Sequence, residues 1–256
     1  MTKITLLGTG TSTGVPMIAC NCKTCRSEDP RDKRLRVSVL IEAHEKTIVI
    51  DTSADFRQQM LSHKVKELDA VLYTHHHYDH IAGFDDLRAF QFLRHKAPMC
   101  YAMRETSDYI QQMFPYAFGK AVQAGGGLPK VPFTVIESSP FKISGLNIIP
   151  IPVEHGLVNV LGYRIGSFAY LTDCNRIPDA SLALLQGLDT LILDGLRYDP
   201  HPTHFSLDEA VAIAKQLKPR ITYLTHMNHD ILHEEGNSKL PSEVRLGYDG
   251  LSFEFD

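Results

Sequence analysis

A histidine-rich motif at residues 74–80 carries the clearest chemistry in the 256-residue chain, with the sequence Thr-His-His-His-Tyr-Asp-His. Neutral imidazoles and a carboxylate suit a borderline divalent ion such as zinc. Side chains two positions apart in an extended segment point to the same side, so His75 and His77 can converge on one ion. Asp79 and His80 lie beyond them and can serve a second ion. A surface histidine run seldom follows an apolar strand or continues with Asp-His, so we interpret the motif as a metal site.

A second candidate site is the stretch CNCKTC at residues 20–25, which holds three of the five cysteines. Three thiolates are one ligand short of a tetrahedral zinc site, so Cys20, Cys22 and Cys25 need a fourth ligand from elsewhere. A redox centre is disfavoured because the thioredoxin context of a Cys-x-x-Cys pair is missing. Unligated buried thiols are the open alternative. The odd cysteine count argues against a disulfide scaffold and favours a reducing cytoplasm.

The elements that must position these residues are mostly strands. Apolar runs typical of buried strands recur along the chain, at residues 4–7, 37–41, 47–50, 70–73, 146–151, 169–171, 190–193 and 221–224. Several of them end directly in polar residues, among them Asp51, His75, Asp173 and His226. Strand ends that deliver polar side chains to one rim are how α/β folds build sites. The sequence therefore predicts an α/β fold with its site at one edge of a sheet.

Helices are expected to be fewer in the first half of the chain. The clearest predicted helix spans residues 206–217, where Ser206 and Glu209 form a capping box and an apolar stripe follows. The segment at about 107–133, which includes Gly125 to Gly127, interrupts the series of apolar, strand-like runs. We interpret it as a small inserted helical cap or loop within a single domain of residues 1–256.

Composition narrows the class of protein. Hydrophobic residues make up 43% of the chain, enough for a substantial core, and no apolar run approaches the roughly 18 residues that span a bilayer. The N-terminal residues are typical of a first strand and not of a signal peptide, so we expect a cytoplasmic protein without membrane contact. A formal net charge of −4 argues against broad binding to nucleic-acid phosphates.

The order of the motifs resembles the metallo-β-lactamase superfamily, from about residue 3 to residue 233. The His-x-His-x-Asp-His motif is followed by His155 in Val-Glu-His-Gly, Asp173 in Tyr-Leu-Thr-Asp and His226 in Tyr-Leu-Thr-His. The resemblance implies a four-layer αββα sandwich with a dinuclear site at one edge. It also implies that seven side chains hold two divalent ions, zinc or manganese: His75, His77 and His155 for the first, Asp79, His80 and His226 for the second, and Asp173 between them.

The chemistry implied by such a site is hydrolysis. Two ions that share a water lower its pKa, and Asp79 could both bind a metal and orient the resulting hydroxide. Asp51 and Asp194 are expected to be outer partners of the ligands or turn residues. His204, directly before the predicted helix, matches a histidine that phosphodiesterases of the superfamily use on the leaving oxygen, a role that suits an imidazole. His201 lies close by, and we favour His204 for its position before the helix.

Within the superfamily the chain is similar to the phosphoribosyl cyclic phosphate phosphodiesterase and ribonuclease Z-like branch. The shared features are Gly8-Thr9-Gly10, the cysteine cluster and a histidine three residues after the last metal ligand, here His229. In that branch the three cysteines and this histidine hold a third, structural zinc ion. A homodimer is expected from the resemblance alone. The glycine-rich stretch is not a dinucleotide fingerprint, since cysteines and a proline follow where a helix should begin.

We therefore predict a dinuclear metal-dependent hydrolase that acts on a small phosphodiester, with a cyclic ribose phosphate as the sharper hypothesis. Hydrolysis of an ester, thioester or lactone is the alternative on the same site, and His204 argues against it. A ribonuclease Z-like nuclease is a further alternative, disfavoured by the acidic charge and the lack of a long arm. A non-enzymatic metal-binding module is improbable with every ligand intact. Redox chemistry is disfavoured because di-iron relatives carry Glu at the position of His77.

Overall fold

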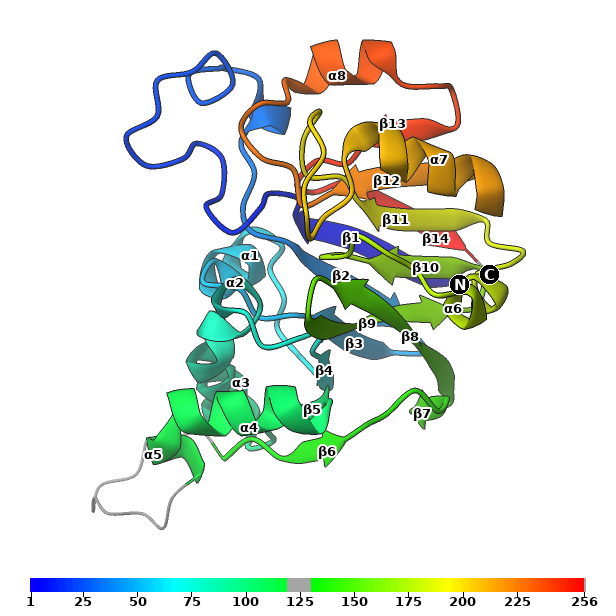
Figure 1. Cartoon of the computed structure of the whole chain (residues 1–256). Coiled ribbons are helices and arrows are strands. Elements are labelled where there is room, and N and C mark those ends of the chain that lie inside the picture. The colour runs from blue at the N-terminus through cyan, green and yellow to red at the C-terminus, as the bar shows by residue number, and fades with distance from the viewer. Residues whose placement is uncertain (119–129, 256) are drawn as a thin grey trace.

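Two seven-stranded β-sheets pack face to face in the computed structural model, which describes residues 1–118 and 130–255 (Figure 1). The strands of the first sheet are β1 (Thr2–Gly8), β2 (Ser38–Ala43), β3 (Lys46–Ile50), β4 (Ala70–Leu72), β5 (Met99–Ala102), β6 (Phe133–Val135) and β14 (Ser252–Phe255). The strands of the second are β7 (Phe141–Ile143), β8 (Leu146–His155), β9 (Val158–Ile165), β10 (Phe168–Leu171), β11 (Thr190–Asp194), β12 (Ile221–Thr225) and β13 (Val244–Leu246). Each of the eight predicted runs lies in a strand to within one residue.

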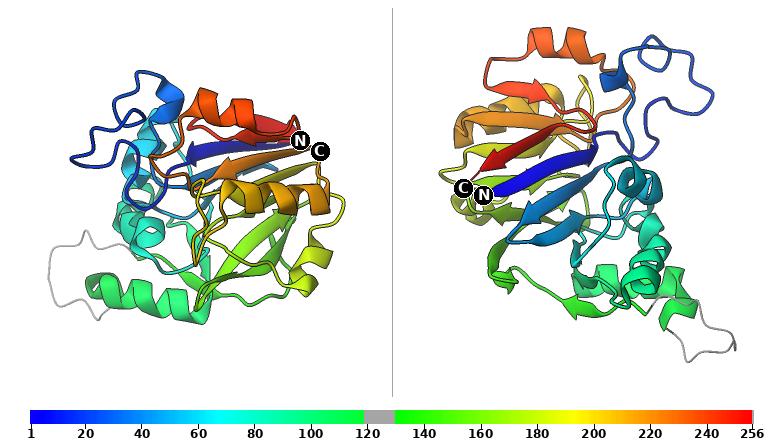
Figure 2. Two further views of the ribbon diagram at one scale, coloured as in Figure 1. Left: turned by 45° about the horizontal axis from the view of Figure 1, so that its top comes forward. Right: turned by 180° about the vertical axis from the view of Figure 1, so that it is seen from behind.

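The strand order is β14-β1-β2-β3-β4-β5-β6 in the first sheet and β13-β12-β11-β10-β9-β8-β7 in the second. Each sheet is mixed. Strands β3 to β6 run parallel to one another, and so do β10 to β13. Strands β1 and β14 pair antiparallel, so the two chain ends lie side by side (Figure 2).

Helices cover the outer face of each sheet. Those beside the first sheet are α1 (Phe56–Ser62), α2 (Tyr78–Ile81), α3 (Arg88–Arg94), α4 (Arg104–Met113) and α5 (Pro115–Phe118), with a short 3-10 turn at Ala82–Leu87; a second 3-10 turn, at Pro30–Asp32, lies in the N-terminal loop. The later helices are α6 (Asp179–Leu184), α7 (Leu207–Leu217) and α8 (His233–Lys239). The expectation of fewer helices in the first half was wrong for the described residues. These early helices are short, so none of them leaves a long apolar period in the sequence.

Three apolar cores hold the four layers together. Along β3, Ile48 and Ile50 face the second sheet, whereas Val49 between them packs beneath the helices with Phe56 of α1. The same alternation in β11 sends Ile192 toward the first sheet and its neighbours toward α7. Strands that are buried on both faces read as continuous apolar runs, which is why the sequence revealed them. The predicted αββα sandwich is confirmed.

The predicted capping box at the start of α7 is also present. The Ser206 side chain accepts a hydrogen bond from the Glu209 backbone N–H, and the Glu209 carboxylate accepts one from the Ser206 backbone N–H. The segment expected to be an inserted cap holds most of α4 and all of α5. Its middle part, with Gly125 to Gly127, lies outside the described residues, so its nature as an insertion stays a prediction. Within the described residues, no helix has the length and apolar character needed to cross a membrane.

The carboxyl ends of the parallel strands meet at one edge of the sandwich. Strand β3 leads into Asp51, β4 into the histidine motif, β10 into Asp173 and β12 into His226, and β11 ends at Asp194. The long N-terminal loop that follows β1 lies beside the segment that precedes α8 at this same edge (Figure 2). The fold therefore gathers the polar strand ends into one place.

Candidate metal centre

The seven side chains expected around a dinuclear site lie together at this edge. They form two groups that share Asp173, and within each group the potential ligand atoms lie within 4.8 Å of one another. One group is His75, His77, His155 and Asp173, and the other is Asp79, His80, Asp173 and His226. All are buried except His77, which is half-buried. The structure thus brings together the seven residues that the resemblance implied, and their role as metal ligands stays a prediction.

The donor atoms are spaced as ligands of a common ion. Asp173 Oδ1 lies 3.2 Å from His226 Nε2, and Asp173 Oδ2 lies 3.3 Å from His80 Nε2. Ligands about 2.1 Å from a tetrahedral ion lie roughly 3.4 Å apart, so these distances match a bound divalent cation. The Nε2 atoms of His75, His80 and His226 are buried without a hydrogen-bond partner. Orphaned nitrogens of this kind are costly unless a metal satisfies them, so the residues fit divalent ions.

Outer partners fix the orientation of two of these imidazoles. Asp51 Oδ2 accepts a hydrogen bond from His80 Nδ1 at 2.8 Å, and the same carboxylate accepts bonds from the Thr74 N–H and hydroxyl at 2.8 Å each. His155 Nδ1 donates to the Thr203 carbonyl at 2.7 Å. With Nδ1 engaged in each ring, Nε2 is left for the cluster. Asp51 is therefore an outer partner and not merely a turn residue.

His204 borders the cluster and is held by Asp194. Its ring centroid lies 4.5 Å from that of His155 and 4.7 Å from that of His226. His204 Nδ1 donates to Asp194 Oδ2 at 2.9 Å, and the Cys174 N–H donates to the same oxygen at 3.0 Å. His201 lies one layer farther out, with its ring 5.2 Å from the His204 ring. This arrangement favours His204 over His201 as the histidine that borders the cluster.

The cluster has a strong affinity for positive charge. Burial opposes ionisation of Asp79, but the charge of His80 and the His226 imidazole, whose Nε2 lies 3.6 Å from Asp79 Oδ2, hold the Asp79 pKa well below its usual range. Burial would lower the pKa of His226, yet Asp173 and Asp79 raise it to about 9. Protons thus gather on imidazoles where carboxylates converge. A divalent cation would satisfy the same carboxylates and leave the imidazoles neutral as ligands.

The middle histidine of the motif has a different neighbour. His76 belongs to neither group, and its ring stacks on Tyr109 of α4 at 4.0 Å with an interplanar angle of 9°. Sequence reasoning missed this contact. Nothing in the local pattern signals it, because Tyr109 reaches His76 only through the placement of α4 against the first sheet.

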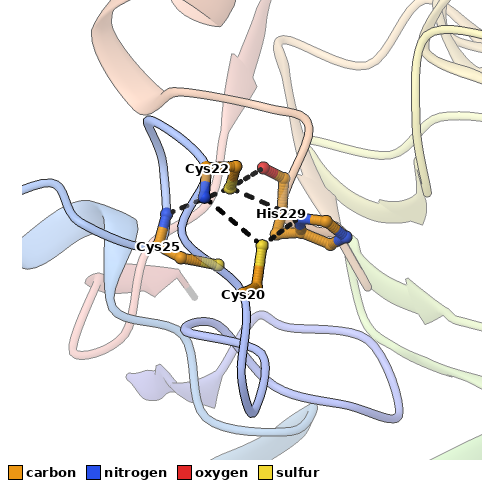
Figure 3. Close-up of side chains that lie close together, drawn as sticks. All are labelled: Cys20, Cys22, Cys25 and His229. Atoms are coloured by element: carbon orange, nitrogen blue, oxygen red, sulfur yellow. Dashed lines mark hydrogen bonds between the residues drawn. The ribbon is translucent and has the colours of Figure 1, made fainter.

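The cysteine stretch and His229 meet at the N-terminal loop, as Figure 3 shows. Cys20 Sγ and Cys22 Sγ each lie 3.4 Å from His229 Nδ1, and Cys25 completes a group whose ligand atoms lie within 4.8 Å of one another. No cysteine in the described residues forms a disulfide. We call this group of Cys20, Cys22, Cys25 and His229 the cysteine clip.

Backbone N–H groups of the cysteine clip point at sulfur. The Cys22 N–H donates to Cys20 Sγ at 3.5 Å, and the Cys25 N–H donates to Cys22 Sγ at 3.4 Å. Burial would raise the pKa of the Cys22 thiol, but bonds with His229 and the Cys25 N–H lower it to about 6. Thiolates are the form that binds zinc, so the clip suits a closed Cys3His site.

Known proteins that resemble this chain indicate the family to which it belongs. The family model described as a beta-lactamase superfamily domain matches residues 46–227. A crystal structure described as a new diphosphatase from the PhnP family is 45% identical and has a TM-score of 0.93, covering 99% of this chain and 97% of that one. Zinc-bound PqqB from Methylobacterium extorquens has a TM-score of 0.80 at 18% identity, covering 99% of this chain and all of that one, which shows a shared fold.

A longer relative is the octanoyltransferase of Porphyromonas gingivalis. It is 41% identical over 249 residues, which cover 96% of this chain and 50% of the relative. The chain thus spans about half the length of that protein. From the family match and the diphosphatase likeness together, the chain belongs to the beta-lactamase superfamily, within it to the PhnP family, and is a metal-dependent hydrolase.

Proposed function

We propose that the protein hydrolyses a phosphodiester-type P–O bond in a small molecule and that His204 protonates the leaving oxygen. The observation that carries this proposal is the position of His204. Its ring borders both His155 and His226, and its Nδ1 is occupied by Asp194. Nε2 is therefore the nitrogen available to a substrate bound at the cluster.

The proposal assigns two divalent ions, zinc or manganese, to the seven clustered side chains: His75, His77 and His155 for one ion, Asp79, His80 and His226 for the other, and Asp173 shared. When bound, such ions would supply an activated water and neutralise charge on the phosphoryl oxygens. We assign to Asp79 the orientation of the attacking water, since its carboxylate lies 3.4 Å from His80 Nε2 and 3.6 Å from His226 Nε2. We also assign a third, structural zinc ion to the cysteine clip.

In the proposed chemical step, His204 donates one proton to the leaving oxygen. The water oxygen bonds to phosphorus and gives up one proton to solvent, the bond to the leaving oxygen breaks with its electron pair on that oxygen, and the His204 proton passes to it; a proton from solvent then restores His204. Asp194 keeps the ring in one orientation during this transfer, as carboxylate partners of catalytic histidines do. A leaving alkoxide gains most from such a proton, since it is far more basic than an aryl oxide.

Relatives support phosphorus as the attacked atom. The 45% identical structure is described as a diphosphatase, an enzyme that cleaves a P–O bond. A formal net charge of −4 supports a small substrate over a nucleic acid. A cyclic ribose phosphate is the sharper form of the hypothesis, and it rests on the resemblance to the cyclic phosphate phosphodiesterases.

Acyl hydrolysis is the second candidate. It is favoured by the octanoyltransferase relative, whose name denotes the transfer of an acyl group. The chain matches half of that protein, so the named activity need not belong to the matched half. A carbonyl substrate would also have less use for the His204–Asp194 pair when its leaving group is a thiolate. We therefore place this candidate second.

The test compares leaving groups on zinc- or manganese-loaded protein. Bis(p-nitrophenyl) phosphate has a good leaving group, whereas an alkyl diester or a cyclic ribose phosphate has a poor one. His204→Ala should lower kcat for the poor leaving group by about 10²- to 10⁴-fold and affect the aryl substrate much less. Asp194→Asn should follow the same pattern more weakly, and His201→Ala serves as the control that keeps activity. Equal losses on both substrates would contradict the role of His204, and turnover of thioesters alone would favour the acyl candidate.

A further inference from the structure

An exposed aromatic platform adjoins the proposed metal centre. Tyr109 stacks on His76 with nearly parallel rings, yet 47% of the Tyr109 surface stays open to solvent. No other ring contact of Tyr109 is found within the described residues. An exposed tyrosine offers a flat apolar face at little entropic cost, which suits the recognition of a flat group.

The platform is within reach of the cluster. The His76 ring centroid lies 5.5 Å from that of His77 and 6.4 Å from that of His75. Tyr109 is the next ring beyond His76. A group stacked on Tyr109 would thus be linked through the His76 ring to the motif that carries four of the proposed ligands. Helix α4, which carries Tyr109, lies on the same outer side of the sandwich as α2, which follows the histidine motif (Figure 1).

The packing of α4 against the first sheet does not depend on the stack of Tyr109 on His76. Thr106, Ser107 and Ile110 form the buried face of α4, and Ile110 packs into the core beneath the first sheet. Tyr109 and Met113, one turn apart, lie on the exposed side instead. The helix is thus held by its other face, and the exposed side is free for another purpose.

A second exposed tyrosine belongs to the histidine motif itself. Tyr78 directly follows His77 and is 63% exposed, although a surface tyrosine there contributes nothing to the core. Exposed aromatic residues beside a site are typical of surfaces that bind a partner molecule. Their position next to proposed metal ligands points to the substrate itself as that molecule.

We infer that Tyr109, backed by His76, stacks against a planar heteroaromatic ring of the substrate, so that the substrate is a nucleotide-type phosphodiester or diphosphate. This inference rests on the proposed function for the phosphoryl group and adds the class of the group attached to it. Stacking of one base on an aromatic side chain is worth about 5- to 150-fold in affinity. Tyr109 is thus a specificity residue that contacts the part of the substrate that does not react.

The kinetic test uses two diesters of p-nitrophenol that differ only in the second alcohol. Thymidine 5′-(p-nitrophenyl phosphate) carries a base, and methyl p-nitrophenyl phosphate does not. Tyr109→Ala should raise KM for the thymidine ester by about 5- to 150-fold and leave the methyl ester unchanged, whereas Tyr109→Phe keeps the wild-type values. Tyr198→Ala, at an exposed tyrosine that lies beneath Lys239 of α8, is the matched control. Equal changes for both esters would overturn the inference.

A binding test makes use of the absence of tryptophan from the chain. The chain contains no tryptophan, so Tyr109→Trp introduces a single fluorescent reporter that can still stack on His76. Titration of the metal-loaded variant with AMP should quench its fluorescence, and ribose 5-phosphate should not. Quenching by AMP with no turnover of the methyl ester would refute the proposed function alone. The absence of quenching by AMP, with the methyl ester turned over, would refute the platform alone.

Discussion

Arg34 is a buried cation whose removal gives the sharpest prediction about stability. Its side chain is fully buried, and it donates to the Asn228 carbonyl at 3.1 Å and to the Ile231 carbonyl at 2.8 Å. It also lies 3.4 Å from Asp32 Oδ1. Arg34→Met keeps the apolar stem but leaves two carbonyls without this donor and the buried Asp32 carboxylate without its cation. Removing one partner of a buried ion pair costs about 3–5 kcal/mol, so we expect a loss of about 4 kcal/mol.

The size of the expected effect can be measured by thermal unfolding of the metal-loaded protein. One kcal/mol corresponds to about 2–4 °C in a chain of this length, so Arg34→Met should lower Tm by roughly 8–16 °C. Arg31→Met is the matched control. Arg31 pairs with Asp29 and Glu234 at the surface, where such pairs are worth about 1 kcal/mol or less. If the two variants lose the same stability, the reasoning from burial is wrong.

Two further predictions concern the same region. Cys22→Ser should remove about one metal ion per chain and leave the dinuclear pair, as measured by elemental analysis, and unchanged metal content would show that the cysteine clip holds unligated thiols. Burial and the nearby Arg31 and Arg34 lower the pKa of His233 to about 4, so the folded protein keeps this ring neutral while the unfolded chain takes up a proton near pH 6.5. The free energy of unfolding should therefore fall as pH drops from 6.5 toward 4, by about 2 kcal/mol at pH 5. Urea titrations at pH 7.5 and pH 5 measure this difference, and in His233→Phe the difference should be smaller by about that amount.

The proposed ligands could be predicted from the sequence because each follows an apolar run. A strand buried on both faces leaves a continuous apolar signature, and the residue after its carboxyl end is then placed at the rim by topology. This logic located Asp173 and His226 although they are far apart in the chain. It also marked Asp51, but it could not say that Asp51 bonds His80, because that contact depends on the pairing of β3 with β4.

The contacts that the sequence did not predict come from tertiary placement. The His76–Tyr109 stack joins a strand end to a helix on another layer, and no periodicity encodes such a meeting. The short edge strands β7, β13 and β14 were missed for a related reason. Edge strands of three or four residues bury little apolar surface, so their sequence resembles that of loops.

Three of the strand ends that carry the site adopt a strained backbone conformation. Asp51, Asp173 and His226 all adopt the left-handed region, with φ of 61°, 53° and 61°. For residues other than glycine this conformation costs about 1–2 kcal/mol each, so the surrounding structure must fix it. For Asp51 the side chain does so through its bonds to Thr74 and His80.

For His226 the N-terminal loop provides the fixing contacts. The Met227 N–H donates to the Thr9 carbonyl at 2.9 Å, and the Thr11 N–H donates to the Met227 carbonyl at 3.1 Å. The residue after His226 is therefore paired on both sides with the loop. Two residues later, His229 joins the cysteine clip, which fastens the same loop to the same segment. The clip is thus placed to hold His226 in a conformation that its own backbone disfavours, which links a structural site to the geometry of the proposed metal centre.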